Sequence, residues 1–191
     1  MRGEIMRSFI AIFFNSKVVE SLARNQNLCR EKGIKGKYVK PDNIHLTVKF
    51  LGDVEQNALD KLQLLDQELE QIEPLKLRLS HLGVFPGKGR PRVLWQGLSG
   101  DDIKDLQQIH QEVEQFTERE LKIAQEKKKF RPHVTLLRNP DIPKGVSIDQ
   151  ISKEELERPE ILVDSISLIK SELTPKGPIY TELKRFVFNN S

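Results

Sequence analysis

The sequence predicts an α+β protein made of two similar lobes that pack as one unit. Strand-like apolar segments alternate with amphipathic helical segments, and each half of the chain holds one strand with the frame His-apolar-Thr-apolar. No linker rich in Gly, Ser or Pro separates the halves. A chain of 191 residues is long enough for two lobes that share a core, so we expect residues 1–191 to form a single bilobal domain.

The first half begins with an apolar run rich in Phe and Ile, which suits a buried strand over 8–14. Asn15 and Ser16 can cap the following helix, because their side chains accept hydrogen bonds from its free N–H groups. Clean alternation over 75–85 predicts a half-buried strand. The other elements predicted in this half are a helix at 16–30, a short strand near 38–39, a strand at 43–52 ended by Gly52, a helix at 53–72 and a strand at 92–98.

The second half follows a similar order. Apolar residues at helical spacing predict a helix over 101–126, and a short strand follows over 132–138. The segment 139–152 has no defined pattern and is expected to be a loop. Pro and Gly residues then favour a turn that joins strands at 161–173 and 179–188.

The composition is that of an ordinary globular protein, with 37% hydrophobic and 31% charged residues. The net charge of +3 does not by itself indicate a nucleic-acid partner. Clusters of Lys and Arg at 32–40, 87–92 and 127–131 flank the segments that carry or adjoin the histidine frames, although solvated loops explain them equally well. The single cysteine, Cys29, excludes an intramolecular disulfide and a multi-cysteine zinc site.

Apolar runs in the sequence are short. None approaches the roughly 20 residues of a membrane span, and the apolar stretch near the start is too short for a signal core. We therefore expect a cytoplasmic protein that does not associate with a membrane.

The repeated frame occurs as "IHLTV" and "PHVTL". Successive side chains of a strand point to opposite faces, so His45 and Thr47 share one face of their strand. His133 and Thr135 likewise share one face of theirs. One histidine on a sheet is usually structural, but two of the four histidines in matched frames favour a functional pair.

This set of side chains suits displacement at phosphorus without a metal. Imidazole has the side-chain pKa nearest neutrality, so a pair of histidines can hold one neutral base and one charged acid. A threonine hydroxyl can donate to an anionic oxygen between the strands. Two His with two Thr form a poor ligand set for zinc, and we expect neither a metal nor another cofactor.

The segments "NIHLTVKFLG" and "FRPHVTLLR" resemble the paired signatures of the two-histidine (HxTx) phosphoesterase superfamily. The resemblance is strongest to its RNA 2′,3′-cyclic phosphodiesterase branch, also called the 2′-5′ RNA ligase-like proteins. It continues through "RSFIAI", "GVFPGKGRPRVLWQGL" and "SELTPKGPIYTEL", and so covers nearly the whole chain. Tyr38 stands where a tryptophan would be expected before "VKP", which keeps an aromatic ring.

The resemblance implies two lobes related by pseudo-twofold symmetry, each with an antiparallel sheet and outer helices, and HxT strands that face a central cleft. It also implies hydrolysis of a terminal 2′,3′-cyclic phosphate of RNA to a 2′-phosphate. Carried onto this chain, His45 is the proton donor to O3′, His133 is the proton acceptor from water, and Thr47 and Thr135 bind the phosphate. The residues themselves leave the order of the two histidines open.

The partners implied are RNA with 2′,3′-cyclic phosphate ends or related nucleotides. A monomer is expected, because a cleft formed within one chain requires no second subunit. Two alternatives stay open: ATP-independent joining of RNA ends through a 2′-5′ bond, and a module that binds such ends with little turnover. Intact His and Thr residues in both frames argue against a decayed site.

Three cations are further candidates for phosphate binding. Lys49 shares the face of His45 by alternation. Arg131 shares the face of His133 if the strand extends that far. Arg138 belongs to the family pattern, but by alternation it lies on the face opposite His133.

The remaining aromatic residues and histidines are weaker candidates for a functional role. Phe14 and Tyr38 could stack on a base, although core packing explains both equally well. His81 and His110 lack the frame, and we assign them no catalytic role. Trp95 is expected in the core.

Overall fold

The computed structural model describes residues 5–154 and 156–189, apart from the side chains of residues 57–59 and 154. The strands are β1 (Ile5–Phe13), β2 (Lys35–Tyr38), β3 (His45–Glu55), β4 (Leu75–Phe85), β5 (Val93–Ser99), β6 (His133–Asp141), β7 (Glu160–Val163), β8 (Ser165–Thr174) and β9 (Gly177–Val187). The helices are α1 (Ser16–Glu31), α2 (Gln56–Lys61), α3 (Leu65–Leu69), α4 (Ile103–Leu121) and α5 (Ile148–Glu154), with short 3₁₀ turns at η1 (Pro41–Asn43) and η2 (Leu62–Leu64).

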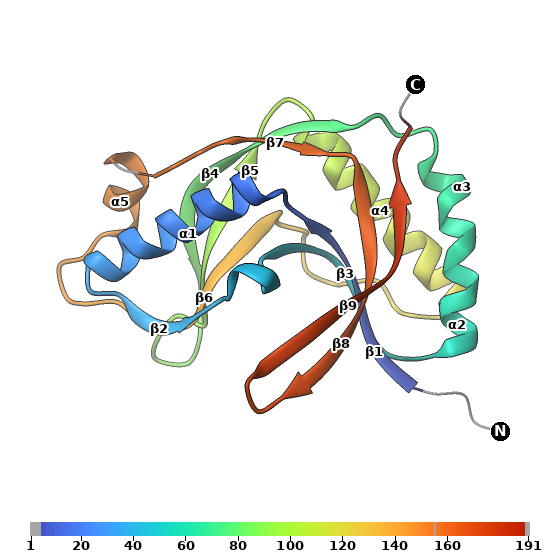
Figure 1. Cartoon of the computed structure of the whole chain (residues 1–191), viewed down its shortest axis with the longest axis horizontal. Coiled ribbons are helices and arrows are strands. Elements are labelled where there is room, and N and C mark those ends of the chain that lie inside the picture. The colour runs from blue at the N-terminus through green and yellow to red at the C-terminus, as the bar shows by residue number, and fades with distance from the viewer. Residues whose placement is uncertain (1–4, 155, 190–191) are drawn as a thin grey trace.

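The described strands form a four-stranded sheet, in the order β3-β1-β8-β9, and a five-stranded sheet, in the order β2-β6-β5-β4-β7 (Figure 1). Every pairing between neighbouring strands is antiparallel. One HxT strand, β3, lies in the four-stranded sheet and the other, β6, in the five-stranded sheet. The α+β class with two antiparallel sheets is confirmed.

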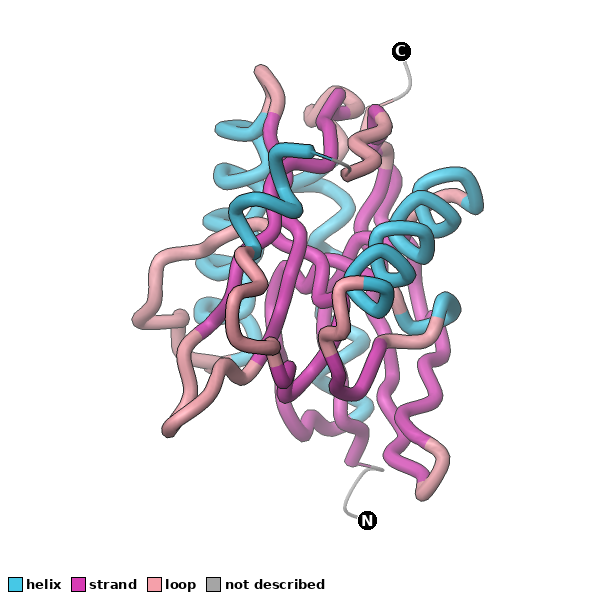
Figure 2. The backbone as a smooth tube through the Cα atoms, turned by 90° about the vertical axis from the view of Figure 1, so that its left-hand side faces the viewer, coloured by secondary structure: helices cyan, strands magenta, loops and turns pink. Residues whose placement is uncertain are grey.

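One group of helices packs against the five-stranded sheet and another against the four-stranded sheet (Figures 1 and 2). Helix α1 contacts β6, and α5 contacts β4 of the same sheet. Helix α4 contacts β3, and α2 and α3 lie next to α4 beside the four-stranded sheet. Each HxT strand therefore has one long helix packed against it.

The two sheets do not coincide with the two halves of the sequence. The C-terminal strands β8 and β9 complete the sheet of β1 and β3, whereas the hairpin β4–β5 joins the sheet of β6. The chain changes sheet at Asp164, so the strand predicted over 161–173 is in fact the two strands β7 and β8. Each half of the sequence does supply a hairpin, but each hairpin joins the sheet that holds the HxT strand of the other half.

Several element boundaries also differ from the prediction. Strand β3 continues through Gly52, which has a φ of 76°, and the helix predicted over 53–72 therefore starts later and is divided by η2. Helix α4 ends where Lys122 adopts a left-handed φ of 59°. Helix α5 lies in the predicted loop. The cap is confirmed, since the Asn15 side chain accepts a 3.0 Å hydrogen bond from the N–H of Val18.

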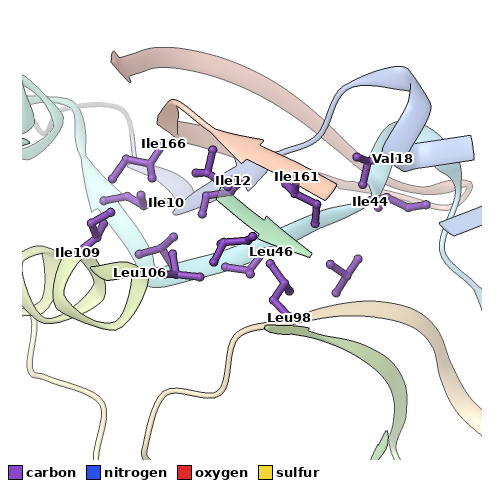
Figure 3. Close-up of a cluster of buried hydrophobic side chains, with 14 of the residues drawn as sticks. Ile10, Ile12, Val18, Ile44, Leu46, Leu98, Leu106, Ile109, Ile161 and Ile166 are labelled. Carbon is purple, nitrogen blue, oxygen red and sulfur yellow. The ribbon is translucent and has the colours of Figure 1, made fainter. Parts of the chain in front are cut away.

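Most buried apolar side chains form a cluster that draws on both sheets and on the long helices. Figure 3 shows part of it around Ile10 of β1, Leu46 of β3 and Leu106 of α4, each with 0% of its surface exposed. Cys29 belongs to the same cluster, and burial raises the pKa of its thiol to about 11. Because both sheets contribute to one core, packing fixes the position of one HxT strand relative to the other.

A β-bulge interrupts the alternation of β3 directly after the frame threonine. Thr47 pairs with Ala11 of β1. Lys49 pairs with Ile10, the preceding residue of β1, so Val48 is an extra residue in β3. A bulge of this kind makes the residues beyond it exchange faces relative to strict alternation.

Strand β6 has a bulge at the matching place. Thr135 pairs with Trp95 of β5. Leu137 pairs with Leu94, the preceding residue of β5, so Leu136 is the extra residue. The two HxT strands thus share their backbone irregularity as well as their sequence frame.

The bulge in β3 turns Lys49 into the core, where 2% of its surface is exposed. Its Nζ lies 2.7 Å from Oε2 of Glu114 on α4 and 2.9 Å from the carbonyl oxygen of Ala124. The next residue, Phe50, is 61% exposed. The prediction that Lys49 shares the face of His45 is therefore wrong, because the extra residue reverses the alternation.

Removing the buried cation should destabilise the fold. In a Lys49→Met variant the Glu114 carboxylate stays buried without its partner, and the free energy of unfolding should fall by about 3–5 kcal/mol. Urea denaturation measures this change. Adding Glu114→Met should restore most of the loss, and a single variant as stable as the wild type would contradict the account.

Candidate active site

Each frame histidine is held by a backbone carbonyl two residues before it. Nδ1 of His45 lies 2.8 Å from the carbonyl oxygen of Asn43, and Nδ1 of His133 lies 2.6 Å from that of Arg131. A carbonyl oxygen only accepts hydrogen bonds, so Nδ1 carries a proton in both rings. Nε2 is then the ring nitrogen that can exchange a proton with a bound molecule.

Threonine completes the arrangement at the first histidine. Oγ1 of Thr47 lies 3.1 Å from Nε2 of His45. In the neutral ring this nitrogen is an acceptor, so the threonine hydroxyl donates to it. The same hydroxyl can turn to donate to an anion that approaches Nε2.

Aromatic rings surround His45 on the four-stranded sheet. The ring centroids of Phe9, Phe13 and Tyr180 lie 5.0, 5.6 and 5.4 Å from that of His45. Phe9 and Tyr180 also contact a small apolar cluster with Ala11 and Ile169 on this face of the sheet. The imidazole therefore lies in a largely apolar enclosure.

Burial lowers the pKa of His45 to about 4. The hydrogen bond to Asn43 opposes this shift, whereas the positive charges of Arg138 and His133 lower the pKa further. These two residues belong to the other sheet. Strands β3 and β6 also contact each other, so the faces that carry the histidines, which we call the histidine faces, lie close together.

His133 has a matching aromatic environment on the five-stranded sheet. The centroids of Phe85 and Trp95 lie 4.8 and 6.0 Å from its ring. Burial lowers its pKa, and the hydrogen bond to Arg131 opposes the shift. Trp95 is partly exposed beside His133, so its predicted place in the core is wrong.

Gly83 makes room for this tryptophan. A Cβ atom at residue 83 would lie 2.3 Å from a ring carbon of Trp95. The absence of a side chain at residue 83 therefore leaves room for the indole against β4.

The bulge in β6 brings Arg138 to the histidine face. Arg138 is exposed and pairs with Val93, two residues from the Trp95 that contacts His133. Its charge acts on the other sheet as well, where burial raises the pKa of Tyr180 and Arg138 opposes that shift. The prediction that Arg138 lies opposite His133 is wrong, because alternation does not survive the bulge.

Arg131 lies just before β6 rather than within it. Its side chain is exposed, and its carbonyl oxygen holds His133. The backbone of Arg131 thus positions His133, and the phosphate contact of its side chain stays a prediction.

The remaining candidates belong to the scaffold. Phe14 and Tyr38 pack against the main core, and the Tyr38 hydroxyl donates a 2.8 Å hydrogen bond to the carbonyl of Ile34. His81 is exposed, and His110 lies on α4 beneath β3. Neither histidine joins the frame pair, as expected.

Sequence reasoning missed the aromatic side chains around the histidines. Strict alternation along β1 places Phe9 and Phe13 on one face, so part of this environment was readable. Tyr180 and Phe85 reach the histidines only through the pairing of distant strands, which the alternation pattern does not reveal.

The structure also bears on metal sites and on membrane-spanning helices. Within residues 5–154 and 156–189, no three His, Cys, Asp or Glu side chains converge as ligands of a metal ion. None of the helices in that same part of the chain has the length and apolar character of a membrane span.

Comparison with known proteins identifies consistent similarities. Residues 20–175 match the family model described as the 2′-5′ RNA ligase superfamily. The protein named RNA 2′,3′-cyclic phosphodiesterase from Aquifex aeolicus is 34% identical over 185 residues, which cover 96% of this chain and 97% of that protein. The protein of the same name from Methanocaldococcus jannaschii is 33% identical, with 95% of this chain and all of that protein covered.

Solved structures are also similar to this chain over nearly its whole length. The structure of TT0787 from Thermus thermophilus has a TM-score of 0.73 and 30% identity, with coverage of 95% of this chain and 97% of that chain. Escherichia coli LigT complexed with 3′-AMP has a TM-score of 0.76 and 26% identity, with coverage of 97% and 99%.

Opening the aromatic enclosure should raise the pKa of His45. Tyr180→Ala admits water to the ring, and water favours the charged imidazole, so the titration midpoint should rise from about 4 toward the ordinary 6.5. NMR of the His45 ring protons over pH 3–8 measures the midpoint. Leu183→Ala, an exposed position on the same strand, is the control, and an unchanged or lower midpoint in Tyr180→Ala would refute burial as the cause.

Proposed function

Because this chain belongs to the 2′-5′ RNA ligase superfamily, we propose that it hydrolyses the 2′,3′-cyclic phosphate at an RNA end and leaves a 2′-phosphate. The observation that carries the proposal is the matched pair His45 and His133. Each has Nδ1 bound to a backbone carbonyl, and the charge of one lowers the pKa of the other across the two sheets. Relatives named RNA 2′,3′-cyclic phosphodiesterase support it along nearly the full chain.

The proposed reaction uses one histidine on each side of the phosphorus. Nε2 of His133 takes a proton from water as the water oxygen bonds to phosphorus. Nε2 of His45, in its charged form, gives its proton to O3′ as the P–O3′ bond breaks. The bond to O2′ stays intact, so the product carries a 2′-phosphate and a free 3′-hydroxyl.

The phosphate oxygens need donors and positive charge near both histidines. We propose that the hydroxyls of Thr47 and Thr135 donate to the non-bridging oxygens and that Arg138 balances their negative charge. In this scheme the exposed side chain of Arg131 would contact the RNA backbone next to His133. Lys49 has no part in this scheme, since its ammonium is paired with Glu114 in the core.

The low pKa of His45 bears on its role as the acid. At neutral pH the free protein holds this ring neutral, because burial disfavours the charge. A phosphate anion beside Nε2 favours the charged form and so raises the pKa. The proton would therefore be taken up together with the substrate.

We propose that no metal ion takes part, because two imidazoles and two hydroxyls supply the acid, the base and the anion donors. We also propose that residues 1–191 act as one bilobal domain and as a monomer, since both histidines come from one chain. RNA ends or related nucleotides would bind between the two histidine faces, in keeping with the LigT complex that contains 3′-AMP.

Joining of RNA ends is the second candidate function, and the description of the matching family model favours it. A 5′-hydroxyl of another RNA would replace water as the nucleophile, and the same cleavage of P–O3′ would give a 2′-5′ bond. A third candidate, an RNA-end binding module, would hold the cyclic phosphate with little turnover.

Product analysis separates these functions. With a cyclic-phosphate oligonucleotide in excess EDTA, the wild type should yield the 2′-phosphate, identified by ³¹P NMR. His45→Ala and His133→Ala should each lower kcat by roughly 10²–10⁴-fold, the usual contribution of a positioned acid or base. His81→Ala, which removes an exposed histidine outside the pair, should turn over as the wild type does.

Full loss of activity in EDTA, or undiminished turnover by either frame variant, would contradict the proposal. A 2′-5′-linked product in the presence of a 5′-hydroxyl acceptor would identify the ligase, and tight binding without turnover the binding module. Sulfur in place of O3′ gives a leaving group that needs no proton. This substrate should restore turnover in His45→Ala, which lacks the proposed acid, and should not restore it in His133→Ala.

A further inference from the structure

The backbone carbonyl of the extra residue in each bulge accepts a hydrogen bond from a helix side chain. In β6 the carbonyl oxygen of Leu136 accepts a 2.8 Å hydrogen bond from Nε2 of Gln26 on α1. Nε2 of Gln26 also donates a 2.9 Å hydrogen bond to the carbonyl oxygen of Val39. The N–H of Val39 in turn donates a 2.9 Å hydrogen bond to the carbonyl oxygen of Leu136. Gln26 is 3% exposed, so it links two backbone segments inside the core.

A different side chain does the same in β3. The carbonyl oxygen of Val48 accepts a 2.9 Å hydrogen bond from Nδ1 of His110 on α4. The His110 ring stacks on Phe130 with centroids 4.0 Å apart and planes 12° apart. Its position is thus fixed both by packing and by the bond to the bulge.

The two contacts correspond in detail. In each strand the bound carbonyl belongs to the extra residue, which comes directly after the frame threonine. In each case the donor comes from the long helix packed against that strand. The donor is an amide in β6 and an imidazole in β3. The two strands therefore share the hydrogen bond to the backbone carbonyl, although the donor side chains differ.

The bulges decide which side chains follow the threonine on the histidine face. Under strict alternation Arg138 would point into the core with Val134, and Lys49 would point toward His45. With the bulges in place, Arg138 stands on the histidine face and Lys49 is buried. The Val48 carbonyl belongs to the edge strand β3 and is bound by His110, whereas the Leu136 carbonyl is bound by both Gln26 and the N–H of Val39. In each strand the helix side chain therefore adds a buried hydrogen bond that stabilises the bulged backbone.

We infer that Gln26 and His110 are positioning residues of the active site, each of which fixes a bulge and thereby the set of side chains around the phosphate. Gln26 acts through Arg138, and His110 acts through the segment from Thr47 to Phe50. Neither touches the substrate. The inference rests on the proposed function, in which Arg138 balances the charge of the phosphate.

A double-mutant cycle between Gln26 and Arg138 tests the inference. Arg138→Ala should lower kcat/KM for a cyclic-phosphate dinucleotide by roughly 10–100-fold, as expected for loss of a charged hydrogen bond. Gln26→Met keeps the volume but removes the donor, and it should lower kcat/KM mainly through a higher KM. The double variant should be no worse than Arg138→Ala, because Arg138 is the group that Gln26 positions.

Ser152→Ala is the matched control, since Ser152 is also buried and bonds helix α5 to the N–H of Leu82 at 2.9 Å. Any effect of this control should multiply with that of Arg138→Ala. Multiplying effects for Gln26→Met as well, or an unchanged kcat/KM in that variant, would overturn the inference. If Arg138→Ala alone has no effect while the frame histidines remain essential, the inference fails and the proposed function stands.

Variants of His110 give a second test, which does not depend on how well Gln26→Met folds. His110→Gln supplies the donor used in the other strand and should keep most of kcat/KM. His110→Leu lacks a donor and should lose roughly tenfold. Equal activity of the two His110 variants would count against a positioning role.

Discussion

The backbone of each HxT strand has to satisfy two demands over a few residues. Up to the threonine, alternation places His and Thr on one face and packs the apolar neighbours on the other. One extra residue then reverses the alternation in both strands. The placement of Arg138, the burial of Lys49 and the exposure of Phe50 all follow from this irregularity, and the helices α1 and α4 supply the side chains that hold it.

The two HxT strands have the same bulge, but different side chains follow it. The residue that reaches the histidine face after the bulge is Arg138 in β6 and Phe50 in β3. One side of the site therefore offers a cation for a phosphate, and the other offers an exposed aromatic ring. An asymmetric substrate, such as a nucleotide with one phosphate and one base, suits such a pair of faces better than a symmetric ligand would.

Burial and backbone hydrogen bonds together set the protonation state of the two imidazoles. Aromatic rings exclude water from His45 and His133 and lower the pKa of both. The carbonyls of Asn43 and Arg131 fix the tautomer, so Nε2 is the titrating nitrogen in each ring. Because their pKa values are lowered, the two imidazoles are largely neutral at neutral pH, and a bound anion would favour their charged forms.

Features set by local sequence were predictable, and those set by distant pairing were not. The Asn15 cap, the long helices and the shared face of His45 and Thr47 follow from residues close in the chain. The bulges have no glycine or other local marker, because the partner strands β1 and β5 create them. The change of sheet at Asp164 and the ring of Tyr180 beside His45 likewise depend on contacts between segments far apart in the sequence.

The proposed mechanism requires that both histidines bind the same phosphate anion. Titration of the whole protein with inorganic phosphate, followed by ¹⁵N NMR of the imidazole nitrogens, tests this requirement. Nε2 of His45 and Nε2 of His133 should shift together, with one Kd and one phosphate per chain, while both Nδ1 signals keep their protonated shifts. Separate Kd values for the two rings, or a shift in only one of them, would contradict a shared site.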